Sequence, residues 1–345
     1  MKKLLAITLL IPALTFAKGP GFGIPSKKWI IGFGNSPVFS GIRFNFKDQN
    51  VEKINGISFT VWQPKEDDGD GVVNGISVGV PLAGGTAERN GINLGIGGIS
   101  ANNSLKGLNL GGLGAGAGQS VKGINLGGLG IGAGEELSGI NLAGIGLGSG
   151  GTVTGFNFGG IGIGAGNTLK GINIGGIGVG SGGDVKGLNI GGIGVGAGDD
   201  LTGINIGGIG MGAGNTAKGI NLAGIGVGAG EEIIGLNVAV IGVGAPSVKG
   251  ISMAAVVGGN VVTGISLAPA MVQIGEKGSS DGELKGVSIS AFNQIRGDNN
   301  GITIGILNMS KGGKGIQIGL LNHNPENPKG LRWLPFFNAN FNKNK

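Results

Sequence analysis

Residues 171–186 read Gly-Ile-Asn-Ile-Gly-Gly-Ile-Gly-Val-Gly-Ser-Gly-Gly-Asp-Val-Lys. A unit of this kind recurs at a constant sixteen-residue step through residues 91–249. Each unit begins with glycine, an apolar residue, a polar residue and a second apolar residue. This alternation places the two apolar side chains on one face of a β-strand and the polar side chain on the other. We therefore expect a β-strand at the start of every unit.

A glycine pair interrupts the alternation in each unit. Ile172 and Ile174 share one parity, whereas Ile177 and Val179 share the opposite one. A single flat strand cannot keep both sets on one face, so the pair Gly175-Gly176 is interpreted as a corner or bulge between two short strands.

The same signature can be followed from residue 41 almost to the end of the chain. It defines eighteen units of 14–22 residues, which together form a repeat array over residues 41–330, with a regular core at 91–249. The units start at Gly41, Gly56, Gly75, Gly91, Gly107, Gly123, Gly139, Gly155, Gly171, Gly187, Gly203, Gly219, Gly235, Gly250, Gly264, Gly286, Gly301 and Gly315.

The constant step favours an all-β solenoid of about 18 short coils, in which equivalent residues stack about 4.8 Å apart. Stacking would align ten asparagines whose amides can hydrogen-bond along a ladder. These are Asn93, Asn109, Asn125, Asn141, Asn157, Asn173, Asn189, Asn205, Asn221 and Asn237. The alternative is an antiparallel outer-membrane β-barrel. Such a barrel should carry girdles of aromatic residues at both membrane interfaces, and a chain with 3 tryptophans and no tyrosine matches this poorly.

Within the solenoid we expect the apolar positions to fill the interior. The asparagine ladder and a glycine face would then form the broad outer surfaces. The opposite arrangement stays open, because inward-facing small residues would display the aliphatic side chains outward, toward lipid for example.

The two ends of the chain differ from the array. Residues 1–17 combine Lys2 and Lys3 with a short apolar run and small residues, which predicts a secretory signal peptide. We expect residues 18–40 to be an N-terminal cap with a first strand, and residues 331–345 to be a closing strand and tail. The predicted location is the cell surface, outer membrane or periplasm of a bacterium.

The C-terminal part carries a family resemblance. Gly-Ile-Gln-Ile-Gly-Leu-Leu-Asn at 315–322, with Leu-Pro-Phe-Phe-Asn at 334–338, resembles an exported bacterial surface-repeat family that includes leptospiral members and is mostly uncharacterised. The resemblance covers about residues 41–341. It implies export and a repeat fold, and it supplies no catalytic residues.

Composition narrows the chemistry. The chain has no cysteine, so it forms no disulfides, and its single histidine, His323, has no partner for a conventional zinc site. Residues 91–249 carry six lysines and seven acidic residues, so they lack the basic stripe that nucleic-acid binding requires. The acidic insertion at 64–71 lacks known calcium-loop spacing and is interpreted as a solvated turn. We predict no catalytic site, cofactor or metal.

The sequence therefore predicts a non-enzymatic, exported structural or interaction scaffold. Its flat β-faces are candidates for contact with a cell surface, the outer membrane or another copy of the chain, and the partner itself is unknown. The first alternative is an integral outer-membrane β-barrel or pore. An ice-binding solenoid is a minor alternative, since the threonine ladder expected of such a protein is missing.

Overall fold

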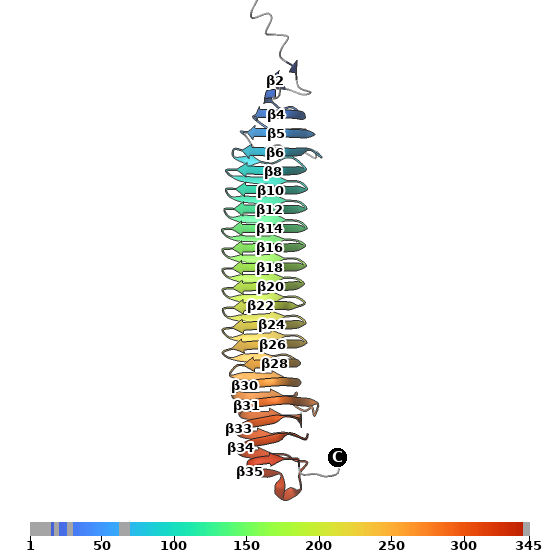
Figure 1. The fold of residues 1–345 in the computed structure, drawn as a ribbon, viewed down its shortest axis with the longest axis vertical. Coiled ribbons are helices and arrows are strands. Elements are labelled where there is room, and N and C mark those ends of the chain that lie inside the picture. The colour runs from blue at the N-terminus through green and yellow to red at the C-terminus, as the bar shows by residue number, and fades with distance from the viewer. Residues whose placement is uncertain (1–14, 17–20, 26–29, 62–69, 341–345) are drawn as a thin grey trace, which may run out of the picture. The chain divides into compact units, whose positions relative to one another are not determined.

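The computed structural model describes residues 15–16, 21–25, 30–61 and 70–340. Over these residues the protein is an all-β, parallel β-solenoid of about 17 turns, so the predicted fold class is confirmed with one turn fewer than the eighteen units counted. Contacts divide the chain into unit 1 (Met1–Asn167) and unit 2 (Thr168–Lys345). Each unit is a stack of coils (Figure 1).

The strands described in unit 1 alternate between long and short from β6 onward. They are β1 (Thr15–Phe16), β2 (Gly21–Pro25), β3 (Ile30–Gly34), β4 (Val38–Asn45), β5 (Lys53–Thr60), β6 (Val72–Gly79), β7 (Leu82–Ala83), β8 (Glu88–Gly95), β9 (Gly98–Ala101), β10 (Ser104–Gly111), β11 (Gly114–Ala117), β12 (Ser120–Gly127), β13 (Gly130–Ala133), β14 (Glu136–Ala143), β15 (Gly146–Ser149), β16 (Thr152–Gly159) and β17 (Gly162–Ala165).

A regular turn of unit 1 consists of one long and one short strand. In the turn formed by β12 and β13, the glycine pair marks the break between two strands as expected, since Gly127 ends β12 while Gly128 and Leu129 lie between the strands. Each strand pairs in parallel with its counterpart one turn away, with Gly107 opposite Gly123 in the long strands and Gly114 opposite Gly130 in the short ones. The antiparallel barrel alternative is therefore wrong, because the sixteen-residue step stacks equivalent strands instead of pairing chain neighbours.

The strands described in unit 2 follow the same plan. They are β18 (Thr168–Gly175), β19 (Gly178–Ser181), β20 (Asp184–Gly191), β21 (Gly194–Ala197), β22 (Leu201–Gly207), β23 (Gly210–Ala213), β24 (Thr216–Ala223), β25 (Gly226–Ala229), β26 (Glu232–Ala239), β27 (Gly242–Gly244), β28 (Ser247–Met253), β29 (Val256–Gly259), β30 (Val261–Ile274), β31 (Gly282–Ile295), β32 (Gly297–Asn299), β33 (Ile302–Met309), β34 (Ile316–His323) and β35 (Trp333–Ala339). A short 3-10 helix, η2 (Lys329–Leu331), precedes β35.

In unit 2 the long strands pair in parallel from β18 to β30, and the short strands pair in parallel from β19 to β29. Strand β30 takes both roles, because its first half pairs with β28 and its second half with β29. Parallel pairing continues through β31, β33 and β34.

Antiparallel strands occur in the N-terminal part of unit 1 and in the C-terminal part of unit 2. In unit 1, β1 pairs with β2 and β2 with β3, before β3 joins β4 in parallel. In unit 2, β35 pairs antiparallel with β34. The signal peptide prediction falls almost wholly outside the described residues. The boundaries predicted at 18–40 and 331–345 stay predictions.

The expected distribution of side chains is wrong for the long strands. The asparagines are fully buried, whereas the isoleucine after the starting glycine is exposed. The buried apolar side chain of a long strand instead lies two residues before that glycine, as in Leu105, Val121 and Leu137. Short strands contribute a second buried residue, such as Ile131. The interior therefore combines aliphatic side chains with the polar ladder. The aliphatic residues that recur at the second and fourth positions of each repeat point outward.

Candidate functional site

The predicted ladder residues all lie inside the solenoid. In unit 1 the side-chain amide Nδ2 of each asparagine donates to Oδ1 of the next: Asn93 to Asn109 at 2.8 Å, Asn109 to Asn125 at 2.6 Å, Asn125 to Asn141 at 2.6 Å and Asn141 to Asn157 at 2.7 Å. In unit 2 the chain of donors runs from Asn173 through Asn189, Asn205 and Asn221 to Asn237, with separations of 2.7–2.9 Å. The ladder satisfies buried polar groups, so its role is internal.

The glycine that starts each sixteen-residue repeat of the regular core faces outward. Gly123 has a φ of 114°, and a Cβ there would lie 2.0 Å from the carbonyl oxygen of the starting glycine one turn before. Only glycine fits this backbone. As a result Lys122, Gly123 and Ile124 all face away from the interior, while Val121 and Asn125 are buried on either side. Simple alternation would have put the glycine position inside.

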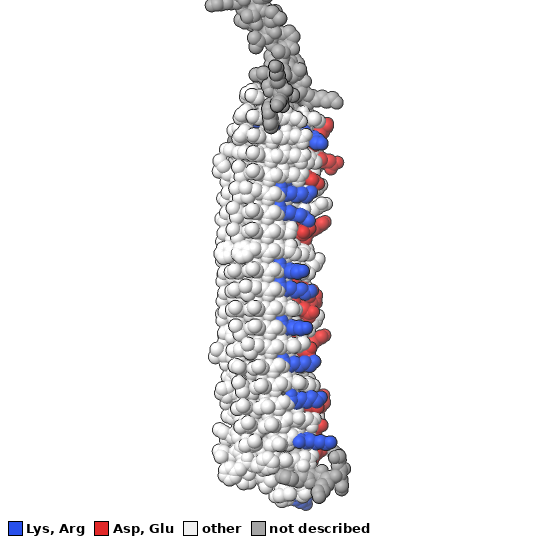
Figure 2. Space-filling view, in the orientation of Figure 1, with Lys and Arg blue, Asp and Glu red and all other residues white. Residues whose placement is uncertain are grey.

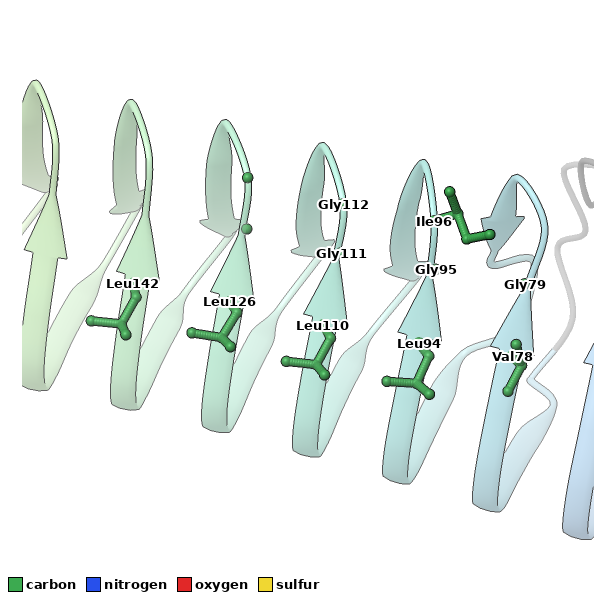
Figure 3. A pocket seen from close by; sticks show the side chains of 12 residues that line it. Val78, Gly79, Leu94, Gly95, Ile96, Leu110, Gly111, Gly112, Leu126 and Leu142 are labelled. Carbon is green, nitrogen blue, oxygen red and sulfur yellow. The ribbon is translucent and has the colours of Figure 1, made fainter.

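We call the outward apolar residues of the long strands the aliphatic face. In unit 1 it contains the exposed second-position residues Ile92, Ile124, Ile140 and Phe156, and the fourth-position residues Leu94, Leu110, Leu126, Leu142 and Phe158. Figure 3 shows the fourth-position leucines in a row, one from each turn and pointing to the same side. They line an open groove of about 520 Å³.

A second apolar column lies at the bend between the long and short strands, and we call it the aliphatic edge. In unit 1 it consists of Ile96, Leu113, Leu129, Ile145 and Ile161. Their exposed fractions run from 47% to 70%, which is higher than those of the second-position residues. Beyond this edge the outward positions of the short strands β11, β13, β15 and β17 are glycines, and Gly132 and Gly164 have open space beside them.

The backbone at the aliphatic edge is paired from turn to turn. The amide of Leu129 donates to the carbonyl of Leu113 at 2.7 Å, that of Ile145 to Leu129 at 2.8 Å, and that of Ile161 to Ile145 at 2.6 Å. The edge therefore presents aliphatic side chains whose own peptide N–H groups already have partners. Such a surface does not require water to satisfy these donors.

Charged side chains gather on the opposite side of each turn, which we call the charged edge. In unit 1, Lys106 lies 3.3 Å from Glu88, and Lys122 pairs with Glu136. The hydrogen bond from Lys122 holds the pKa of Glu136 below its ordinary value. Figure 2 shows the lysines and acidic residues along one border of the visible face, with uncharged residues over the rest.

Unit 2 repeats the arrangement. Its aliphatic edge consists of Ile177, Ile193, Ile209, Ile225 and Ile241, and its second-position residues include Ile172, Ile204 and Ile220. The amide of Ile209 donates to the carbonyl of Ile193 at 2.7 Å, so this edge is paired in the same way. Across the turn, ion pairs Lys186–Asp184 and Lys249–Glu232 each measure 2.5 Å. The hydrogen bond with Asp184 raises the pKa of Lys186 above its ordinary value.

A buried ionic cluster near the start of unit 1 was not expected from the sequence. Arg43 Nη2 donates to Asp48 Oδ1 at 2.5 Å, and Arg89 lies 3.6 Å from Asp48 Oδ2. Burial alone would raise the pKa of Asp48, but the two arginines and hydrogen bonds from Asn45 and Thr60 hold it below its ordinary value. Arg89 occupies the position where later turns carry Leu or Val, which is the signal that sequence analysis missed.

Other candidate chemistry is sparse in the part of the chain that the structure describes. Over those residues, no three His, Cys, Asp or Glu side chains lie close enough together to hold a metal ion. The ring of His323 lies tilted against that of Trp333 with centroids 4.2 Å apart, and burial lowers the pKa of His323. The acidic insertion at 64–71 falls mostly outside the described residues. No helix within the described ranges is long and apolar enough to cross a membrane.

Comparison with known proteins found no matching family model, no matching curated protein and no matching solved structure. The site must therefore be interpreted from its own geometry. Its dominant feature is the extended aliphatic surface opposite a charged edge, present in each unit.

Proposed function

We propose that the protein is a non-enzymatic, exported scaffold that works through its aliphatic face and aliphatic edge. The observation that carries this proposal is the outward position of isoleucine and leucine at every regular turn, while asparagine is kept inside. Monomeric soluble proteins rarely expose continuous apolar patches of more than a few hundred Å², and larger ones mark interaction sites. The resemblance to exported surface-repeat proteins supports the export part of the proposal.

The regular repeat supports a scaffold in which one contact is multiplied along the array. Each turn adds one second-position, one fourth-position and one edge residue to the surface, so a weak contact per turn gives strong binding over several turns. Stability in such arrays comes from contacts between neighbouring turns, which leaves the outer positions free for binding.

The proposal is tested with the full chain in detergent and after detergent removal. We expect detergent-free protein to bind an apolar fluorescent dye and to sediment as an assembly, and the double variant Ile124→Ser/Ile140→Ser to do both less. The matched control is Gln119→Ser/Ser138→Ala on the charged side of the same turns, which should behave as the parent. A parent chain that remains monodisperse and does not bind the dye would refute the proposal.

A further inference from the structure

We propose that the partner of the aliphatic edge is the acyl-chain layer of one membrane leaflet, into which the edge inserts while the charged edge stays among headgroups and water. This inference rests on the proposed function and names its partner. It makes each unit a monotopic membrane-binding stack of coils, held by the edge side chains of its own regular turns.

The first argument is the shape of the apolar surface. In unit 1 it covers the long-strand face, continues round the edge at Leu129 and Ile145, and passes onto the glycine positions of the short strands, such as Gly132. A second copy of the chain could cover one flat face, but it would leave the projecting edge in water. A fluid layer of acyl chains can surround the edge from both sides.

The second argument is the placement of charge. Lys122 and Glu136 lie on the opposite side of the turn from the edge, and Lys106 and Glu88 repeat this placement. Figure 2 shows that within each unit the charged residues follow one border and leave the adjoining visible face uncharged. An interfacial protein needs one apolar side and one charged side, and this is the division seen here.

The third argument is the depth of the apolar region. Five residue steps separate Lys122 from Gly127, the last residue of β12 before the bend that carries Leu129, and they span about 17 Å at 3.3 Å per residue. One leaflet contributes about half of the roughly 30 Å hydrocarbon thickness. With the strands standing upright, the edge would reach the middle of the bilayer while the lysines reach the headgroups.

The fourth argument is the paired backbone of the edge. Polar backbone groups without partners are excluded from the hydrocarbon region because no water is available to them. The N–H groups of Leu129, Ile145 and Ile161 meet this condition through their turn-to-turn bonds, and those of Ile193 and Ile209 do so in unit 2. A soluble protein loop would normally leave such groups to water.

The test uses single cysteines, because the chain has none of its own. Full-length Ile145→Cys at the edge and Glu135→Cys on the charged side are each labelled with an environment-sensitive fluorophore and mixed with neutral phosphatidylcholine vesicles. We expect both proteins to float with the vesicles. Lipids with a quencher on the acyl chain should quench the label at 145 at least about twofold more than the label at 135.

The triple variant Leu129→Ser/Ile145→Ser/Ile161→Ser should reduce vesicle binding at least tenfold with an unchanged circular dichroism spectrum. The control triple variant Asn103→Ser/Gln119→Ser/Glu135→Ser should bind as the parent does. Flotation only with anionic vesicles, or equal quenching at 145 and 135, would overturn the lipid assignment.

Failure of this inference is distinguishable from failure of the proposed function. A chain that self-associates and binds apolar dye but ignores vesicles would have a second copy as its partner, which overturns the lipid assignment alone. A chain that neither associates, binds dye nor binds vesicles would overturn both.

Discussion

Truncating two neighbouring residues of one strand tests which side chains lie inside the solenoid, because loss of a buried side chain should cost more stability than loss of an exposed one. Asn205→Ala removes a side chain whose Oδ1 accepts from Asn189 Nδ2 and whose Nδ2 donates to Asn221 Oδ1, each at 2.9 Å. Ile204→Ala removes its outward neighbour, which is 43% exposed. Both changes introduce alanine in the same strand and the same turn. They differ mainly in whether the inner or the outer side of the sheet loses atoms.

The magnitudes follow from what each change leaves behind. Asn205→Ala leaves a buried donor and a buried acceptor without their ladder partners, at about 1–3 kcal/mol each. Asn189 Nδ2 keeps a 3.4 Å contact with the Gly187 carbonyl, so we expect a total of about 2–4 kcal/mol. Ile204→Ala should cost about 1 kcal/mol or less, because its side chain is only partly removed from water.

Urea unfolding followed by circular dichroism gives the stability difference, and hydrogen exchange of amides 201–221 shows whether the loss is local. Asn205→Ser should recover part of the loss, because serine takes this position naturally at Ser252, where it accepts from Asn237 at 3.5 Å. The reasoning is refuted if Ile204→Ala costs 2–5 kcal/mol, as a buried isoleucine would, while Asn205→Ala is neutral.

Three further predictions concern unit 1. Gly123→Ala should destabilise the chain by at least about 2 kcal/mol because of its positive φ and the close carbonyl, whereas Gly132→Ala, with open space around it, should stay within about 0.5 kcal/mol in thermal unfolding. Leu137→Ala should cost about 2–5 kcal/mol and Leu113→Ala, 60% exposed, less than about 1 in the same assay; equal losses would contradict the assigned core. Asp48→Asn should cost about 3–5 kcal/mol by leaving two arginines without their carboxylate. Because the pKa of Asp48 is lowered on folding, its stabilisation is complete above the unfolded value of 3.8 and is lost as pH falls through the folded value. In an acid titration below pH 3.8 the variant should therefore lose less stability than the parent.

The architecture was predictable because it depends on the constant length of the sequence repeat. The constant step from Gly91 to Gly235 requires equal turns, and equal turns stack equivalent residues. The parity change at Gly175-Gly176 indicated two strands per turn, which β18 and β19 confirm. The antiparallel alternative failed for the same reason, since it gives no role to a fixed step.

The inside and outside of the turn were not predictable from hydrophobicity alone. Alternation groups Ile124 with Leu126 and opposes them to Asn125, but it does not say which side is enclosed. The positive φ of Gly123 turns outward a position that alternation from Val121 would place inside. Burial of asparagine is acceptable because every turn brings an identical partner within hydrogen-bonding distance.

The ionic cluster shows another limit of local patterns. Arg43, Asp48 and Arg89 come from turns of unequal length, so their meeting depends on how each turn closes. The residue types carried a weak signal, since Arg89 stands at the column occupied by Leu105 in the next turn. A single charged residue in an apolar column is therefore the feature to look for in sequences of this kind.

Side-chain amide hydrogen exchange tests the buried ladder most directly, without altering the protein. The Nδ2 protons of ladder residues such as Asn109 and Asn205 should exchange far more slowly than those of Asn215, which is exposed at a bend on the charged side of its turn. The account predicts two separate classes of asparagine in one NMR spectrum, with the ladder residues in the protected class. Exchange of the ladder protons at the rate of Asn215 would contradict it.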